Sequence, residues 1–157
     1  ILKDENSLKE RFLNLGPEPF DEKFSEKYIY SSLRNKEKNI KNFLLDQNFV
    51  SGIGNIYANE ILFLSKIRPT QKGTTLNEKD CKKIAKNSQK VLKNAIDKGG
   101  SSIRDFKDTS GKKGSFQKEF FVYGRNGLNC KRLRCQGIIK KKVISNRSTF
   151  YCSTCQK

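Results

Sequence analysis

The sequence predicts a mainly α-helical chain that ends in a small β unit held together by cysteines. Over the first hundred residues, apolar side chains recur at three- and four-residue spacing, which is typical of amphipathic helices. Beyond residue 120 the pattern changes to β-branched and aromatic residues near turns, and four of the five cysteines lie there. We therefore expect a helical region up to about residue 100, an exposed polar loop, and then a hairpin.

Turn signals and apolar spacing place the first helices. A short helical pattern in residues 1–16 stops at Gly16, and the two prolines of "GPEP" predict a rigid turn. Further helices are expected at about 21–33, around Ile40 to Leu44, and from Asn55 to about residue 66, ahead of Pro69.

The clearest helix carries Ile84, Val91 and Ile96 on one face. Its candidate caps are Thr74, Thr75 or Asn77 at the start and the pair Gly99 and Gly100 at the end. Cys81 lies three residues before Ile84 on the same face, so we interpret it as a small buried apolar residue.

Basic residues dominate the chain, with 33 Lys and Arg against 16 Asp and Glu and a formal net charge of +17. Such an excess favours a polyanionic partner, nucleic acid first and an anionic membrane surface second. No apolar stretch approaches the roughly 20 residues of a membrane helix, and no signal-peptide pattern opens the chain. From Phe120 to Lys157 there is no acidic residue, whereas a merely soluble surface mixes both signs. The charge pattern therefore predicts that this end of the chain binds nucleic acid.

The spacing of the cysteines predicts a metal site. Cys130 and Cys135 are separated by four residues and Cys152 and Cys155 by two, with sixteen residues between the pairs. Two close pairs joined by a hairpin-sized segment suit a tetrahedral zinc ion with four thiolates, which leaves no open coordination position and indicates a structural role. The alternatives are four unrelated cysteines and an iron–sulfur cluster. The chain has no histidine, which excludes a histidine general base and histidine metal ligands.

Several stretches, taken together, resemble the bacterial formamidopyrimidine-DNA glycosylases, bifunctional DNA repair enzymes related to endonuclease VIII. The stretch "LGPEPF" resembles the interdomain linker of that family, and "IKNFLLDQNFVSGIGNIYANEILFLSKIRP" resembles its helix-two-turns-helix motif. The stretches "FVYGRNGLNC" and "NRSTFYCSTCQK" resemble the two ends of its zinc finger. The resemblance implies a helix-two-turns-helix domain followed by a four-cysteine zinc finger that binds one structural Zn²⁺.

The resemblance covers only the C-terminal half of the family. Its members begin with a Pro-Glu pair whose proline amine forms a Schiff base with the sugar, whereas this chain opens with Ile1 and Leu2. We expect the parent protein to be a DNA glycosylase with AP lyase activity that removes oxidised purines such as 8-oxoguanine and formamidopyrimidines. The chain alone is expected to be inactive, and its partners to be damaged double-stranded DNA and the N-terminal catalytic domain that it lacks.

The resemblance also suggests how the chain is divided. The predicted parts are a linker or remnant at 1–19, the helix-two-turns-helix region at 20–100, a lesion-capping loop at 101–119 and the zinc finger at 120–157. The loop "DFKDTSGKKGSFQ" resembles the segment that closes over an everted 8-oxoguanine, with Lys112 at its tip. A plain exposed linker is the alternative. The loop and the glycine of "YGR" favour purine lesions over an endonuclease VIII-type preference for pyrimidine lesions.

The DNA contacts that the resemblance implies are Lys36, Lys41, Gly54, Asn55, Lys112 and Arg147. The turn "SGIGN" delivers Asn55 to a helix N-terminus, where backbone N–H groups and the helix dipole favour a phosphate and Gly54 permits close approach. The resemblance gives Arg147 two roles: to hold the phosphates that flank the lesion, which suits its planar guanidinium, and to act in the δ-elimination step. The alternatives are a plain N-cap for Asn55, and solvated side chains for the lysines and for Arg147.

The first cysteine pair departs from the family, because "CKRLRC" is two residues longer than the usual C-x-x-C. Two other functions remain open: a stand-alone, non-catalytic zinc ribbon that binds nucleic acid, and a protein-interaction zinc domain with incidental charge. An odd number of cysteines without a secretory signal fits a reducing compartment. We therefore expect a monomeric, cytoplasmic bacterial protein without membrane contacts.

Overall fold

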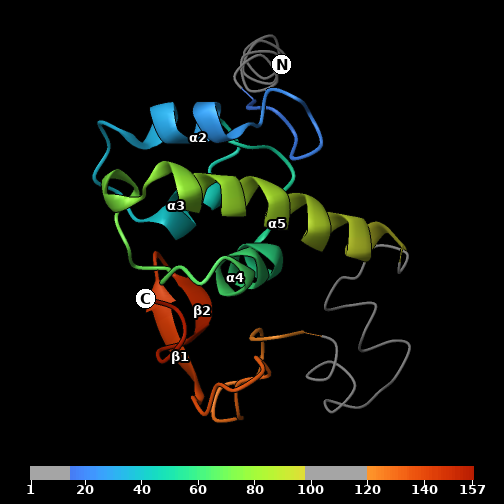
Figure 1. The fold of residues 1–157 in the computed structure, drawn as a ribbon, viewed down its shortest axis with the longest axis vertical. Coiled ribbons are helices and arrows are strands. Elements are labelled where there is room, and N and C mark those ends of the chain that lie inside the picture. The colour runs from blue at the N-terminus through green and yellow to red at the C-terminus, as the bar shows by residue number, and fades with distance from the viewer. Residues whose placement is uncertain (1–14, 98–119) are drawn as a thin grey trace, which may run out of the picture.

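The structure, a computed structural model, describes residues 15–97 and 120–157. Its elements are α2 (Glu26–Leu33), α3 (Ile40–Leu45), α4 (Asn55–Leu64), the short 3₁₀-helix η1 (Gly73–Thr75), α5 (Glu78–Asp97), β1 (Ile139–Ile144) and β2 (Arg147–Cys152). Figure 1 shows the helices stacked above a two-stranded hairpin, with α4 next to the strands. The predicted fold class, mainly α with a small β hairpin, is confirmed. In the described part of the chain, every helix is too short or too polar to cross a membrane.

Side-chain caps decide where the helices begin. The Ser25 hydroxyl accepts the Tyr28 N–H at 3.2 Å ahead of α2, and the Asn77 side chain accepts the Asp80 N–H at 2.8 Å ahead of α5. Helix α2 therefore starts five residues later than the predicted residue 21, because residues 21–24 form turns and bends that lead to the cap. The helices α3 and α4 begin close to the positions expected from the sequence.

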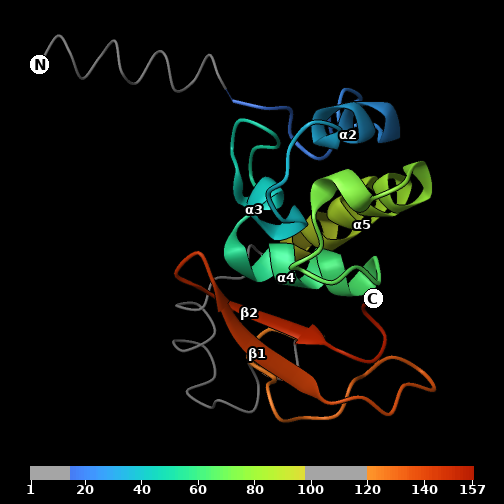
Figure 2. The same ribbon diagram turned by 90° about the vertical axis from the view of Figure 1, so that its left-hand side faces the viewer.

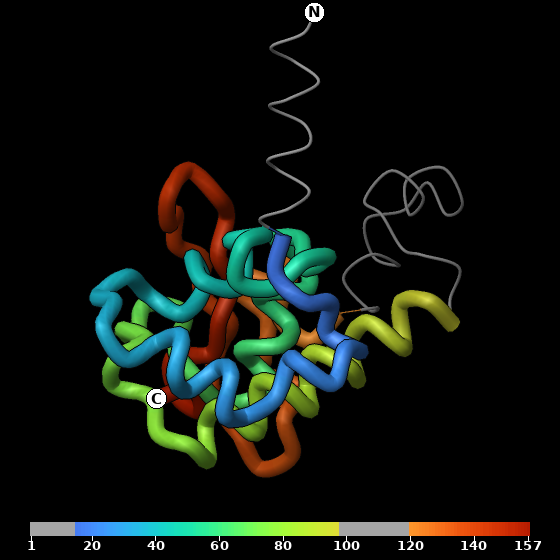
Figure 3. The backbone as a smooth tube through the Cα atoms, turned by 90° about the horizontal axis from the view of Figure 1, so that it is seen from above, coloured from blue at the N-terminus to red at the C-terminus, as the bar shows by residue number. Residues whose placement is uncertain are grey.

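The main core lies among the helices. Ile29 and Leu33 of α2 and Ile61 of α4 are fully buried, and they pack in one cluster with Cys81 and Ile84 of α5. Helix α5 packs on both α2 and α4, and the view in Figure 3 shows α2 crossing above its first half. The interpretation of Cys81 as a buried apolar residue is confirmed, and burial raises the pKa of its thiol to about 11, so it stays protonated at neutral pH.

A second, smaller core joins the hairpin to α4. Phe63 of α4 packs with Val122, Ile139 and Phe150, all of them buried. The strands are antiparallel with Ile144 opposite Arg147, and both residues of the two-residue turn between them have positive φ, as in a type I′ turn. Figure 2 shows the closed end of the hairpin rising toward α3, where the Asn42 amide donates to the Ser145 hydroxyl at 3.1 Å. The hairpin turn therefore lies against α3.

Candidate nucleic-acid interface and zinc site

The four cysteines predicted as metal ligands converge on one point. The sulfur atoms of Cys130, Cys135, Cys152 and Cys155 all lie within 4.8 Å of one another. Two of the separations are 3.8 Å (Cys130 to Cys155) and 3.7 Å (Cys135 to Cys152). Sulfurs that each lie about 2.3 Å from a tetrahedral zinc ion are about 3.8 Å apart, so the donor set and its spacing fit one Zn²⁺. All four positions of such an ion are filled by protein, which makes the site structural.

Hydrogen-bond donors surround these sulfurs and tie them to α4. The N–H of Arg132 lies 3.4 Å from Cys130 Sγ, and the N–H of Gly137 lies 3.4 Å from Cys135 Sγ. The Arg132 guanidinium lies 3.3 Å from Cys155 Sγ and also donates to the carbonyl of Phe63 in α4. A Cβ at Gly137 would lie 2.6 Å from Cys152 Sγ, so a glycine is required there. These donors favour the thiolate form of the ligands and connect the metal site to the end of α4.

The start of α4 is arranged as an anion site. Gly54 is the N-cap and offers no side-chain hydrogen bond to the first turn. A Cβ at Gly54 would meet no atom within 4 Å, so internal packing does not require a glycine at this position. Within the described residues, Asn55 Oδ1 is buried without a hydrogen-bond partner, but this acceptor oxygen does not attract an anion, so a phosphate here would bind the backbone N–H groups of the first turn. The positive end of the helix dipole, an uncapped first turn and an open approach together favour a phosphate here.

Three side-chain donors meet at one carbonyl, that of Ser148, directly after Arg147. Lys41 Nζ lies 3.2 Å from this oxygen, Asn55 Nδ2 3.1 Å and Asn59 Nδ2 3.5 Å. Asn55 and Ser148 are 93 positions apart in the sequence. The structure therefore brings the start of α4 next to the start of β2, where Arg147 lies exposed to solvent.

Lys41 lies inside this junction and not on the surface. Its side chain is fully buried, and its ammonium group donates to the Thr149 hydroxyl at 2.6 Å as well as to the Ser148 carbonyl. Burial lowers the pKa of Lys41 to about 8, and the positive charge of nearby Arg147 lowers it further in the same direction. A DNA contact by Lys41 stays a prediction, because in this structure its ammonium group holds the hairpin.

Two family models match the chain. The model described as the formamidopyrimidine-DNA glycosylase H2TH domain matches residues 15–107, which is more than half of the chain. The model described as a zinc finger found in FPG and IleRS matches residues 127–157. The chain belongs to the formamidopyrimidine-DNA glycosylase family. The zinc-finger match also supports zinc over an iron–sulfur cluster at the four cysteines.

Curated relatives and solved structures agree with this family. The formamidopyrimidine-DNA glycosylase of Neisseria meningitidis is 43% identical over 91% of this chain and 51% of that protein. The Lactococcus lactis enzyme, solved bound to DNA that contains an AP site, superposes with a TM-score of 0.80 at 38% identity, over 97% of this chain and 55% of that chain. A MutM structure in complex with DNA that contains carbocyclic 8-oxo-G gives a TM-score of 0.80 at 38% identity, over 97% and 54%. The chain spans about half the length of the curated relatives it matches.

The residues that the glycosylase resemblance singled out differ in how far the structure describes them. Lys36 is exposed in the connection between α2 and α3, and Gly54 is exposed ahead of α4. Lys112 and the predicted capping loop at 101–119 lie outside the described residues. The longer first cysteine pair does not separate the four sulfurs, because its extra length is taken up by a loop in which Arg134 has a φ of +68° and Leu133 is 86% exposed.

Sequence reasoning missed the polar side chains of α4 that hold the zinc finger. Glu60 is 4% exposed, and its carboxylate accepts the N–H groups of Phe121, Val122 and Tyr123 at 2.6, 2.9 and 3.2 Å. Burial raises the pKa of Glu60, and these three hydrogen bonds oppose that shift. A signal was present in the sequence, because Asn59 and Glu60 interrupt the otherwise apolar helix "NIYANEILFL", and buried polar groups need partners.

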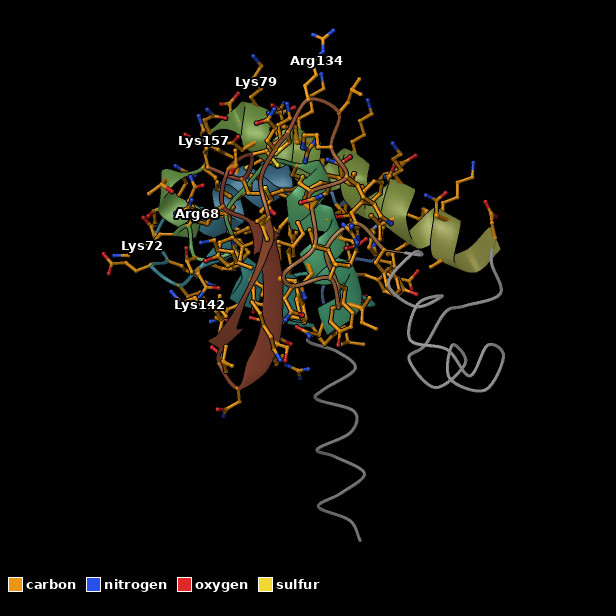
Figure 4. All side chains as sticks on the ribbon, turned by 90° about the horizontal axis from the view of Figure 1, so that it is seen from below. Arg68, Lys72, Lys79, Arg134, Lys142 and Lys157 are labelled. Atoms are coloured by element: carbon orange, nitrogen blue, oxygen red, sulfur yellow. The ribbon has the colours of Figure 1, made fainter. Side chains whose placement is uncertain are left out.

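Basic side chains extend beyond the predicted contacts. Figure 4 shows Lys72, Lys79, Arg134, Lys142 and Lys157 along one side of the molecule, together with half-buried Arg68, whose guanidinium donates to the carbonyls of Ser153 and Gln156. Other cations of the zinc finger are used internally: the guanidinium of Arg125 donates to the carbonyls of Phe121 and Asn129, and Lys131 donates to the carbonyl of Phe120. The positive charge of this region therefore has two uses, internal cross-linking and an exposed cationic surface.

Proposed function

We propose that this chain is the DNA-binding part of a bifunctional DNA glycosylase and AP lyase that removes oxidised purines from double-stranded DNA. The observation that carries the proposal is the contact of Asn55 with the Ser148 carbonyl at 3.1 Å, which brings a helix N-terminus next to an exposed arginine. A phosphate seated at the start of α4 would meet N–H donors from the helix, and the neighbouring phosphate would meet the guanidinium of Arg147.

The relatives support this proposal. They are DNA glycosylases by name, and solved members of the family are bound to DNA with an AP site or an oxidised guanine. Because the chain spans about half of their length, the excision and lyase steps are proposed for the protein that contains it. The chain alone is expected to bind DNA as a monomer without cleaving it.

Binding to a short duplex with one abasic site tests the DNA contacts. Substitution Arg147→Ala removes hydrogen bonds from a charged donor, each worth about 1.5–3 kcal/mol, so we expect affinity to fall roughly ten- to hundredfold. Asn55→Ala should weaken binding in the same direction. The matched control is Lys93→Ala on the exposed part of α5, which should leave affinity within about twofold.

Borohydride trapping tests the enzyme class. The protein that contains this chain should form a covalent adduct with abasic-site DNA on reduction, whereas the chain alone should give none. Unchanged affinity of the Arg147→Ala variant would contradict the proposed interface. Specific DNA binding without any trapped adduct in the containing protein would instead point to a non-catalytic binding module.

A further inference from the structure

Strand β2 has one edge paired with β1, and its other edge faces α4. On that second edge the side chain of Asn59 takes the place of a neighbouring strand. Its Oδ1 accepts the N–H of Phe150 at 2.8 Å, and its Nδ2 lies 3.5 Å from the carbonyl of Ser148. Asn59 is fully buried in α4. One side-chain amide thus satisfies two backbone groups of the strand, as a peptide group of an adjacent strand would do.

The same amide reaches back to its own helix. Nδ2 of Asn59 also donates to the carbonyl of Asn55 at 2.8 Å, one turn earlier. The partners fix the orientation of the amide, because the Phe150 N–H can only donate and the carbonyls of Asn55 and Ser148 can only accept. A carboxylate at this position would keep the bond to Phe150 but would set an oxygen against two carbonyl oxygens.

These bonds link the two proposed DNA contacts through one rigid group. Asn55 begins α4, and Ser148 directly follows Arg147 on β2. Asn59 is bonded to the carbonyls of both Asn55 and Ser148. Beside the bonds of Asn55 and Lys41 to the same Ser148 carbonyl, the separation between the helix N-terminus and the arginine therefore depends on a fully buried amide that has no exposed atoms to offer to DNA.

We propose that Asn59 is a positioning residue that holds Arg147 at the correct distance from the start of α4, so that both engage the same DNA strand. The inference rests on the proposed function, since it concerns the geometry of the DNA clamp. It assigns a role in DNA binding to a residue that does not touch DNA.

The test uses the protein that contains this chain, loaded with zinc, and a fluorescent abasic-site duplex. Asn59→Asp is nearly isosteric, replaces the donor half of the amide by a second oxygen and adds one negative charge, so its control must add the same charge. We expect Asn59→Asp to lower DNA affinity about tenfold while one zinc per chain and the helical circular dichroism are kept. The matched control is Asn87→Asp on α5, whose Nδ2 donates to the Ser65 hydroxyl at 3.0 Å, at the end of α4 opposite to Asn55; there affinity should stay within twofold of wild type.

A double-mutant cycle with Arg147→Ala separates positioning from general destabilisation. If Asn59 acts through Arg147, the loss caused by Arg147→Ala should be several-fold smaller in the Asn59→Asp background than in the wild type. If Asn59→Asp does not fold, Asn59→Ser carries the same cycle with a smaller, uncharged side chain. Fully additive effects, or wild-type affinity of the variant that folds, would overturn the inference.

The outcomes also keep the inference separate from the proposed function. If the wild type binds the duplex and Arg147→Ala weakens binding, the proposed interface stands whatever Asn59→Asp does. If Arg147→Ala has no effect, the interface itself is wrong, and the inference about Asn59 falls with it. Hydrogen exchange of the Phe150 amide gives a direct structural readout: it should stay slow in Asn59→Asp, which keeps the acceptor, and become fast in Asn59→Leu, which loses it.

Discussion

At the scale of single residues, the junction around Ser148 depends on buried polar groups that satisfy one another. Lys41 illustrates the balance, because its ammonium group is removed from water and lies near the positive charge of Arg147. Hydrogen bonds to the Ser148 carbonyl and the Thr149 hydroxyl offset part of the cost of burial. A solvated lysine, the alternative that the sequence left open for Lys41, is wrong because α3 turns this side chain toward the hairpin.

The lowered pKa of Lys41 leads to a prediction about pH. Below about pH 8 the Lys41 amine is protonated in both the folded and the unfolded protein. Between about pH 8 and the ordinary pKa of 10.5, the folded protein loses this proton while the unfolded protein keeps it. Stability relative to the Lys41→Met variant should therefore rise between about pH 8 and pH 10 and stay flat between pH 6 and 7. Denaturant unfolding of the zinc-saturated proteins measures this difference, and a flat difference across both ranges would contradict the assignment.

At the scale of elements, α4 is the support of the zinc finger. Its first turn contacts the hairpin through Asn55, and its middle contacts the segment 121–123 through Glu60. Its last turn contacts the zinc knuckle through the carbonyl of Phe63. Aromatic packing reinforces the same interface, with Phe63 stacked on Phe121 at 5.4 Å between ring centroids. A 38-residue unit with few buried apolar residues gains its order from the metal and from this helix together.

Glu60→Gln should weaken the contact between α4 and the zinc finger. Glutamine has nearly the same shape, but it cannot offer two acceptor oxygens to three N–H groups, and at least one buried donor loses its partner at a cost of about 1–3 kcal/mol. We expect a clearly lower thermal midpoint with zinc still bound. Glu37→Gln is the control, because Glu37 is exposed and its 3.8 Å pair with Lys72 is worth little. Equal midpoints for wild type and Glu60→Gln would show that the three bonds do not carry this interface.

At the scale of the whole molecule, the charge favours a polyanionic partner. The net charge is +17, and three of the cations, Arg125, Lys131 and Arg132, make hydrogen bonds inside the protein. Other cations lie exposed along one side of the molecule. Among the described residues, ion pairs within 4 Å are confined to Lys38 with Asp46 and Lys72 with Glu37. Most exposed cations are therefore available to phosphates.

The affinity for duplex DNA should fall steeply with salt. Each phosphate that is neutralised contributes about −0.9 to the slope of log affinity against log salt concentration, so about five to eight contacts predict a slope of roughly −4 to −7. Equilibrium binding between low and moderate salt measures it. Arg147→Ala should make the slope about one unit shallower. A slope near zero would instead favour a protein-interaction domain whose charge is incidental.

The sequence by itself determined the local features of this protein. Helix positions followed from apolar spacing and from caps such as Asn77, and the zinc ligands followed from two cysteine pairs, because these signals act over a few neighbouring residues. Only the tertiary structure showed that Lys41 is buried, that Asn59 caps the edge of β2, and that Glu60 gathers three N–H groups. Each of these features pairs a side chain with a backbone group 61 to 107 positions away. Whether a polar side chain faces water or a distant peptide group is set by chain packing, which local spacing does not encode.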